Sequence, residues 1–372
     1  MLATPYELPL SQLIEELPAP ERLERVRADT NASCFIGICG FEARCLAAVR
    51  RLKELGWCAS KGVCVKYNDT SMETENAKHY EAMAREISAL IGGGVPATIS
   101  HDDHHLDADF GSKLIELLRE MDVNVDDPSV HIVVDITVGS SRLLLEGLHA
   151  LFQCKASVTL VYSESARYRP FFSEYLEHVE EQRLHVVPPP EFLTHGVDRV
   201  EVLRRFPGRY SDARPALVIV FPSFSFTRSS AIIEELSPSR VQWIFGVPHL
   251  VENRWRLDAQ KAYHRGLVDK SHRECYVSTF DYRETLEVLE NVYRKRRDNY
   301  SVFIASLGSK MQKVGQVLFH MMRPEAAAVV SIPRIWDADR FSSDEPRAVF
   351  ALQFGACEAL QAALRSTTRL RM

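Results

Sequence analysis

The stretch His131–Arg142, HIVVDITVGSSR, is the part of the sequence from which the fold is interpreted. Its apolar, β-branched start predicts a strand that is buried on both faces, as in a parallel sheet covered by helices. Gly139 and the two serines after it predict a tight turn, and LLLEGLHALF continues with the period of an amphipathic helix. The stretch therefore predicts one strand–turn–helix step of an α/β protein.

The turn of this step is also a candidate ligand site. Small residues and hydroxyls just before a helix leave backbone N–H groups available to an anion. Ser140 and Ser141 occupy this position, and Arg142 adds a positive charge. We therefore expect a nucleotide or another phosphate-bearing small ligand near this turn.

The composition is that of an ordinary globular protein. The chain has 372 residues, of which 46% are hydrophobic, and its net charge of −5 gives no overall basic field for nucleic acid. The eight cysteines form no CxxC pair and predict reduced core thiols. The first residues lack the pattern of a signal peptide, and no apolar run is long enough for a membrane span. We expect a cytoplasmic protein with no membrane partner.

Strand-like runs alternate with helical periods in both halves of the chain. Five strands are expected in each half: 34–39, 62–69, 97–103, 132–134 and 157–164 in the first, and 216–221, 241–249, 274–282, a run from 301, and 326–336 in the second. The alternation predicts an α/β fold with two tandem Rossmann-like units and mainly parallel sheets. Because the two halves match step by step, we infer an internal duplication.

A proline-rich segment predicts the boundary between the two units. Pro188–Pro190 are consecutive prolines, and a stretch rich in Gly, Pro and Arg continues to Pro215. We therefore expect residues 1–185 to hold a leader helix, near 19–28, and the first Rossmann-like unit. Residues 186–215 are expected to form a linker, and residues 216–372 the second unit with a C-terminal helix.

The loops after the first and fourth strands of each half are the expected ligand loops. In open parallel sheets, ligands lie at the carboxyl ends of the strands where the strand order reverses. The candidate ligand-binding residues in these four loops are Gly40, Glu42, Arg44, Asp135, Thr137, Gly139, Ser140, Ser141, Arg142, Ser223, Arg228, Ser309 and Lys310. Their arginines and lysine suit phosphate or carboxylate groups. The alternative is that the glycines and serines only make turns and cap helices.

Asp135 is the best candidate for a catalytic residue. A carboxylate at the end of a strand can bind a hydroxyl or a metal, or act as a base. It can equally cap its own turn through a side-chain hydrogen bond. The second half has Ala305 or Ser306 at this position, so any chemistry is expected in the first half.

The sequence HDDHHLDAD, residues 101–109, is the densest group of possible metal ligands. Its Asp103-His104-His105 string resembles the DHH phosphoesterases, whose metal sites also require aspartate motifs on earlier strands, and no DxD is present early in this chain. A solvated loop with a helix cap at Asp107 is the preferred interpretation, and a Mn²⁺ or Zn²⁺ site is the alternative. We expect neither a metal nor a cofactor, because the usual dinucleotide, ATPase, hydrolase and metalloprotease motifs are also absent.

DITVGSSR resembles a motif of the CARF sensor domains of CRISPR-associated proteins, and of the related SAVED domains, which are similar to two fused CARF units. In that family the fourth strand often ends in an Asp, Thr, Gly pattern, matched here by Asp135, Thr137 and Gly139 and more loosely by Arg142. Residues 40–44 occupy the position of the family's other ligand loop. The resemblance implies binding of a cyclic oligonucleotide second messenger in antiviral defence.

The resemblance leaves out the usual effector domain, for which we expect no room in this chain. It therefore implies a sensor without a fused effector, an enzyme that degrades the messenger, or a subunit of a larger complex. The leading hypothesis is a nucleotide-sensing protein of a prokaryotic defence system, with its ligand at the ends of the strands. The alternatives are an enzyme that processes a nucleotide or phosphoester through Asp135, and a non-catalytic scaffold that binds a protein partner in a defence complex.

Overall fold

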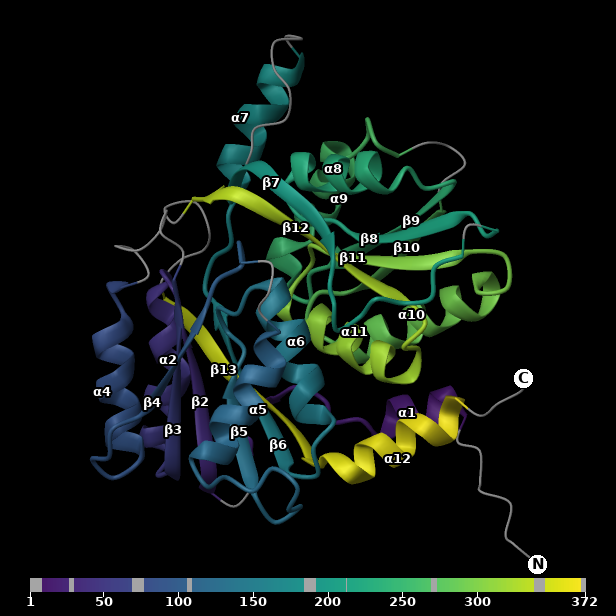
Figure 1. Ribbon diagram of the computed structural model, residues 1–372. Coiled ribbons are helices and arrows are strands. Elements are labelled where there is room, and N and C mark those ends of the chain that lie inside the picture. The colour runs from purple at the N-terminus through teal and green to yellow at the C-terminus, as the bar shows by residue number, and fades with distance from the viewer. Residues whose placement is uncertain are drawn as a thin grey trace, which may run out of the picture. The chain divides into compact units, whose positions relative to one another are not determined.

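The computed structural model describes residues 9–26, 30–68, 77–105, 109–183, 192–211, 213–268, 273–337 and 345–368 (Figure 1). The chain divides into two units. The first unit contains Met1–Ala166 together with Asp344–Met372, and the second contains Arg167–Ser343. None of the described helices is long and apolar enough to cross a membrane.

The elements of the first unit alternate between strands and helices. In chain order they are α1 (Leu10–Glu16), β1 (Glu21–Arg22), the 3₁₀ turn η1 (Leu23–Arg25), β2 (Asn31–Cys39), the 3₁₀ turn η2 (Ala43–Leu46), α2 (Ala47–Glu54), β3 (Cys58–Tyr67), α4 (Tyr80–Leu90), β4 (Ala97–His101), α5 (Phe110–Glu120), β5 (His131–Asp135), α6 (Ser141–Phe152), β6 (Ser157–Ser165), β13 (Pro346–Ala356) and α12 (Cys357–Thr368).

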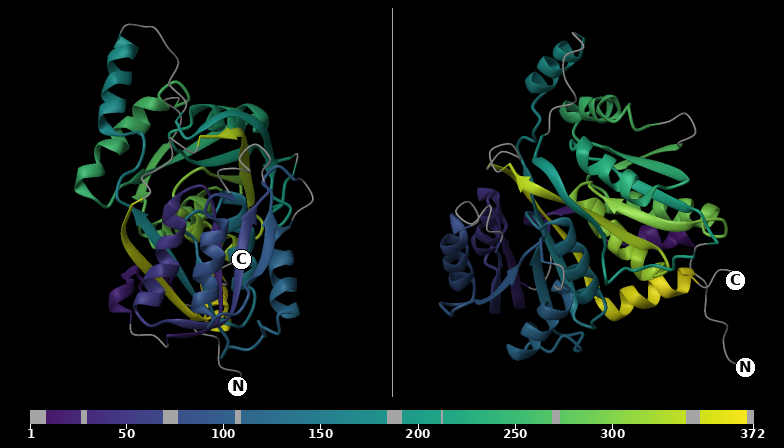
Figure 2. Two further views of the ribbon diagram at one scale, coloured as in Figure 1. Left: turned by 90° about the vertical axis from the view of Figure 1, so that its left-hand side faces the viewer. Right: turned by 45° about the horizontal axis from the view of Figure 1, so that its top comes forward.

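The second unit follows the same alternation. Its elements are α7 (Phe172–Arg183), β7 (Thr194–Val202), β8 (Ala216–Phe221), α8 (Phe226–Leu236), β9 (Arg240–Val247), the 3₁₀ turn η4 (Val251–Asn253), α9 (Trp255–Tyr263), β10 (Arg273–Ser278), α10 (Tyr282–Arg296), β11 (Ser301–Ser306), α11 (Lys310–Met322) and β12 (Ala327–Trp336). Figure 2 shows, from two further directions, that helices lie on both faces of each sheet.

Both sheets have the same arrangement of parallel strands. The strand order is β1-β13-β6-β5-β2-β3-β4 in the seven-stranded sheet and β10-β9-β8-β11-β12-β7 in the six-stranded sheet. In each sheet the five parallel strands therefore stand in the order third, second, first, fourth, fifth, and an antiparallel strand pairs with the fifth. The predicted α/β class with two similar, mainly parallel units is confirmed.

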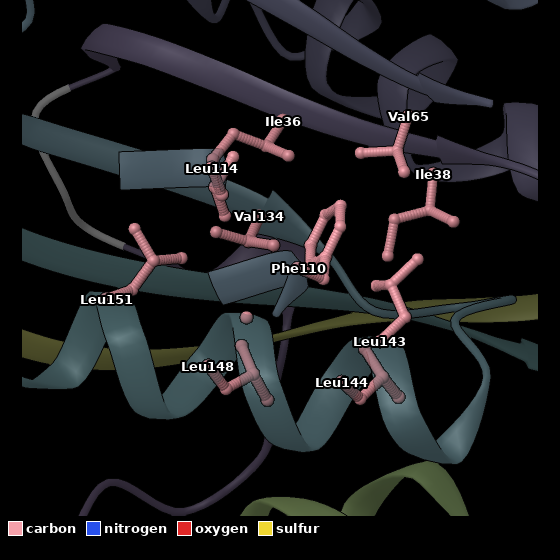
Figure 3. A pocket seen from close by; sticks show the side chains of 11 residues that line it. Ile36, Ile38, Val65, Phe110, Leu114, Val134, Leu143, Leu144, Leu148 and Leu151 are labelled. Carbon is pink, nitrogen blue, oxygen red and sulfur yellow. The ribbon is translucent and has the colours of Figure 1, made fainter. Parts of the chain in front are cut away.

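Alternate residues of the first sheet face different helices. Phe35 and Val133 belong to the core under α2 and α4. Their neighbours Ile36 and Val134 line a small pocket on the opposite face, under α5 and α6. Figure 3 shows Leu143 and Leu151 of α6 pointing toward the strands, with Phe110 between the helix and the strand residues. Because the lining of this pocket is entirely hydrocarbon, it offers no group that would hold a nucleotide.

Residues 344–372 belong to the first unit, whereas the sequence predicts that all of 216–372 belong to the second. The reason is that β13 pairs antiparallel with β6, from Pro346↔Ser165 to Ala356↔Ser157. The strand β7, which pairs antiparallel with β12, lies within the segment expected to be a linker. Pro188–Pro190 lie outside the described residues. The leader forms α1, β1 and η1 in place of one helix near 19–28.

Candidate functional site

The four expected ligand loops lie where the strand order reverses. In the first sheet β2 pairs with β5, with Ile36 opposite Val134. In the second sheet β8 pairs with β11, with Ile219 opposite Ile304. Each pair joins the first and fourth parallel strands, so the loops that follow them leave the same edge of the sheet side by side.

Asp135 closes its own turn and keeps one oxygen unused. Asp135 Oδ1 accepts hydrogen bonds from the Thr137 amide, at 2.9 Å, and from the Thr137 hydroxyl. Thr137 Oγ1 in turn accepts from the Ser163 amide on β6 at 2.9 Å. Asp135 Oδ2 and the Ser163 hydroxyl are buried without a hydrogen-bond partner among the described residues. Burial raises the pKa of Asp135 to about 7, against the opposing effects of Thr137 and the nearby Arg44 guanidinium.

Glu42 and Arg44 form a buried ion pair in the loop after β2. Arg44 Nε lies 2.9 Å from Glu42 Oε2, and both side chains are at most 5% exposed. Arg44 Nη1 also donates to the Ser163 carbonyl at 2.8 Å. A Cβ atom at Gly40 would lie 3.3 Å from Val138, so the glycine lets the two loops approach. A ligand phosphate would therefore have to compete with Glu42 for the Arg44 guanidinium.

Ser140 caps α6 and connects it to the residues after β4. Its hydroxyl accepts from the Leu143 amide and donates to Asp103 Oδ1 at 2.8 Å. His101 Nε2 lies 3.0 Å from the same carboxylate oxygen. The Ser140 amide donates to the Tyr67 hydroxyl at 2.6 Å. The Ser140 amide, which the sequence predicts to face an anion, is therefore already hydrogen-bonded within the protein.

Arg142 is likewise turned into the protein. Its Nε lies 3.3 Å from Glu146 Oε1 within α6, and its Nη1 donates to the carbonyls of Asp103 and His105. Ser141 is the first residue of α6. A Cβ atom at Gly139 would lie 2.5 Å from Leu144 Cδ2, so this turn requires glycine for close packing on the helix. The first unit thus pairs both of its candidate arginines with its own carboxylates.

Arg228 in the second unit repeats the role of Arg44. Its Nε donates to the Ser331 carbonyl at 3.0 Å, and its guanidinium lies 5.4 Å from the centre of the Trp336 ring. In the first sheet Val161 pairs with Asp135, and in the second sheet Val329 pairs with Ala305. Ser163 and Ser331 each lie two residues further along the fifth strand, so they occupy equivalent positions in the two units. The same anchor, from the first loop to the carbonyl of the fifth strand, is therefore present twice.

Ser309 caps α11 through a capping box. Its hydroxyl accepts from the Gln312 amide, while Gln312 Oε1 accepts from the Ser309 amide. The same hydroxyl donates to the Thr279 carbonyl at 2.6 Å. Lys310 is the first residue of the helix. Ser223 in the neighbouring loop has a buried hydroxyl with no partner among the described residues.

Lys313 was not predicted from the sequence, although it belongs to this site. Its side chain is buried, and Nζ donates to the Gly308 carbonyl at 2.5 Å and weakly to the Ser309 carbonyl at 3.5 Å. Within the described parts of the chain, no carboxylate lies within ion-pair distance of it. Burial, and then the charges of Lys310 and Arg228, hold the pKa of this amine well below the usual lysine range. Its position four residues after the cap Ser309 is the signal that could have revealed it.

The two units differ in charge at equivalent positions. Leu144 stands four residues after the cap Ser140, where the second unit has Lys313 after Ser309. Ala305 stands where the first unit has Asp135. The strand ends of the first unit therefore hold two carboxylates, Glu42 and Asp135, whereas the second unit has an alanine in place of the aspartate and adds the basic side chain of Lys313.

The described residues contain no group of three side chains placed to hold a metal ion. Of the cluster 101–109, His101 and Asp103 belong to the network around Ser140. Asp109 is the N-cap of α5, accepting from the Gly111 and Ser112 amides. Asp107, the expected cap, lies outside the described residues.

Comparisons with known proteins find distant structural likenesses. No family model and no curated protein matches the chain. A Type III CRISPR defence DNA nuclease activated by cyclic oligoadenylate has a TM-score of 0.48 and 14% identity, over 83% of this chain and 67% of that one. The cytoplasmic domain of a prokaryotic cation chloride cotransporter has a TM-score of 0.23 and 7% identity, over 84% of this chain and 98% of that one. Neither likeness is close enough to assign a function.

Proposed function

We propose that this protein is a nucleotide sensor of a prokaryotic defence system, and that the strand ends of its second unit bind a phosphate group of the ligand. The motif resemblance at Asp135, Thr137 and Gly139 supports a cyclic oligonucleotide as the ligand. The resemblance also supports a role in antiviral defence, in which a protein partner would receive the signal.

The observation that carries the proposal is the burial of Lys313 with no described carboxylate at ion-pair distance from its amine. Among the buried arginines, Arg44, Arg142 and Arg323 each contact a carboxylate. Lys313 contacts only backbone carbonyls, and its charged neighbours are Lys310 and Arg228. A lysine amine buried beside two cations and away from any described carboxylate is costly for the fold, so its presence favours a site that receives an anion from outside.

The loop after β8 and the first turns of α8 and α11 also carry polar groups that are suited to phosphate. Buried hydroxyls of Ser223 and Thr227, and the amide nitrogen of Gln312, have no partner among the described residues. All three groups can donate hydrogen bonds to phosphate oxygens. Together with Lys313 they supply the charge and the donors that phosphate recognition requires.

Calorimetric titration with a panel of cyclic and linear nucleotides tests the proposal. We expect at least one nucleotide to bind the native protein, and Lys313→Met to lower its affinity by tenfold or more. Lys295→Met, a change at an exposed lysine in the last turn of α10, is the matched control and should leave the affinity unchanged. If no nucleotide of the panel binds, or if both variants bind like the native protein, the proposal fails.

A second candidate function rests on Asp135. Its unused Oδ2 atom, and a pKa raised by burial to about 7, are properties of a general base that works near neutral pH. We therefore also propose a test for turnover of the nucleotides that bind. Product formation that is lost in Asp135→Asn, with binding retained, would support an enzyme. Binding without turnover would exclude the enzyme and leave only the sensor function.

A further inference from the structure

We propose that the second-unit site takes up one proton at Lys313 Nζ when it binds a phosphate or sulfate group. This inference rests on the proposed function and adds to it a dependence of ligand affinity on pH. The proton comes from the solvent, forms an N–H bond with the lone pair of the neutral amine, and leaves a buried ammonium next to the incoming anion.

The first step concerns the state of Lys313 before a ligand binds. Among the described lysines, Lys313 is the one that is buried, and its Nζ atom contacts the carbonyl oxygens of Gly308 and Ser309. A neutral amine keeps two N–H bonds, enough to donate to both carbonyls. The charged form would add a third N–H for which the described residues provide no acceptor, and it would lie beside the cations Lys310 and Arg228. Unlike an arginine, a lysine can avoid this cost by losing its proton.

The described charged groups packed around Lys313 are cations, or carboxylates that already have other partners. On α8 the neighbouring charge is Arg228, and on α11 it is Lys310. At the start of α10, which packs against α11, Asp281 pairs with Arg283, and Glu284 accepts from the Ser278 amide. Tyr282, the buried tyrosine described at the start of α10, stays neutral because burial raises its pKa.

The arrival of an anion reverses this balance. A bound phosphate or sulfate brings negative charge between Lys310 and Arg228, and it supplies the missing acceptor for the third N–H of Lys313. The ammonium form is then favoured, because an opposite charge within a few ångströms stabilises it strongly in a buried site. By linkage, affinity must rise as the pH falls, by up to about tenfold per pH unit for one proton.

Sulfate is the probe of choice, since it carries no titrating proton near neutral pH. Lysine ε-carbon NMR signals of the full-length protein report the protonation of Lys313 directly, with the signal assigned by its loss in Lys313→Arg. Without sulfate we expect this amine to titrate well below the other lysines. With sulfate, compared with chloride at equal ionic strength, its titration should move upward by about one pH unit or more.

Lys313→Arg is the informative variant, because arginine keeps the positive charge and does not lose its proton. We expect it to bind sulfate with an affinity that changes less than twofold between about pH 6.5 and 8.5, whereas the native affinity falls severalfold or more over that range. If sulfate protects neither protein against heat nor moves any lysine signal, the proposed phosphate site itself fails. If sulfate binds but the Lys313 amine is charged throughout, or both proteins show the same pH dependence, the proton uptake is refuted and the phosphate site stands.

Discussion

Replacing Asp135 by asparagine should change the stability of the first unit in a pH-dependent way. The stability of the variant, measured relative to the native protein, should increase as the pH rises. The folded protein holds the pKa of Asp135 at about 7, above its ordinary value of 3.8. An acid whose pKa is raised on folding binds more protons in the folded than in the unfolded state. Between these two values the native stability must therefore fall as the pH rises, by about 1.4 kcal/mol per unit.

The expected magnitude follows from this range. Between pH 5 and pH 8 the native protein crosses about two units of the range, which corresponds to roughly 3 kcal/mol. The asparagine side chain of the variant keeps an oxygen for the Thr137 donors but does not ionise, so the substitution removes this dependence. The cost of its own amide group is constant with pH and cancels from the comparison. For a domain of this size, 3 kcal/mol corresponds to a relative shift in Tm of about 6–12 °C.

Thermal unfolding followed by circular dichroism at several pH values between 5 and 8.5 measures this difference. The predicted result is a difference in Tm, Asp135→Asn minus native, that increases steadily up to about pH 7 and is then constant. Parallel curves for the two proteins would show that Asp135 is already ionised at low pH. Such a result would refute both the buried neutral carboxyl and the candidate general base.

Two further predictions concern the second unit. Glu290→Gln leaves the buried Arg323 guanidinium without its counter-ion, which lies 2.5 Å away in the native protein, and should cost about 3–5 kcal/mol of stability in denaturant unfolding. Burial raises the pKa of Glu290, but hydrogen bonds from two arginines outweigh this effect and leave the pKa below its ordinary value. The stabilisation by the ion pair is therefore present above about pH 4.5 and is lost in acid. Gly315→Ala places a Cβ atom 2.4 Å from the Tyr282 carbonyl oxygen and should force α10 and α11 apart, costing about 1–3 kcal/mol. Gly266→Ala, where no atom lies within 4 Å of the added carbon, is the control and should unfold like the native protein.

The parallel strands were predictable from the sequence, because each is a short apolar run followed by a helical period. The loops at the strand-order reversal followed from this alternation. The antiparallel strands were not. The burial pattern of β7 contains exposed and half-buried residues in a polar region, and β13 pairs with a strand nearly two hundred residues earlier. Only this long-range pairing assigns the C-terminus to the first unit, and no local pattern reports it.

The sequence predicts where the site lies in the fold, but it does not predict which of the charged side chains there are paired with one another. Arg44 and Arg142 were expected to be free for a ligand, yet the fold pairs them with Glu42 and Glu146. Such pairing depends on side chains brought together by turns and helix faces, and charge counts along the sequence do not reveal it. Lys313 was overlooked because a single lysine in an amphipathic helix is normally exposed, and its burial depends on the packing around Gly308.

The most direct test of the central claim is the calorimetric comparison of native protein and Lys313→Met with the nucleotide that binds best. If the strand ends of the second unit hold a phosphate group of the ligand, the variant will bind at least tenfold more weakly. It should also unfold at the same temperature as the native protein or at a higher one, since a buried amine without a counter-ion has been removed. Undiminished affinity in a folded variant would contradict the claim and would move the ligand away from Lys313.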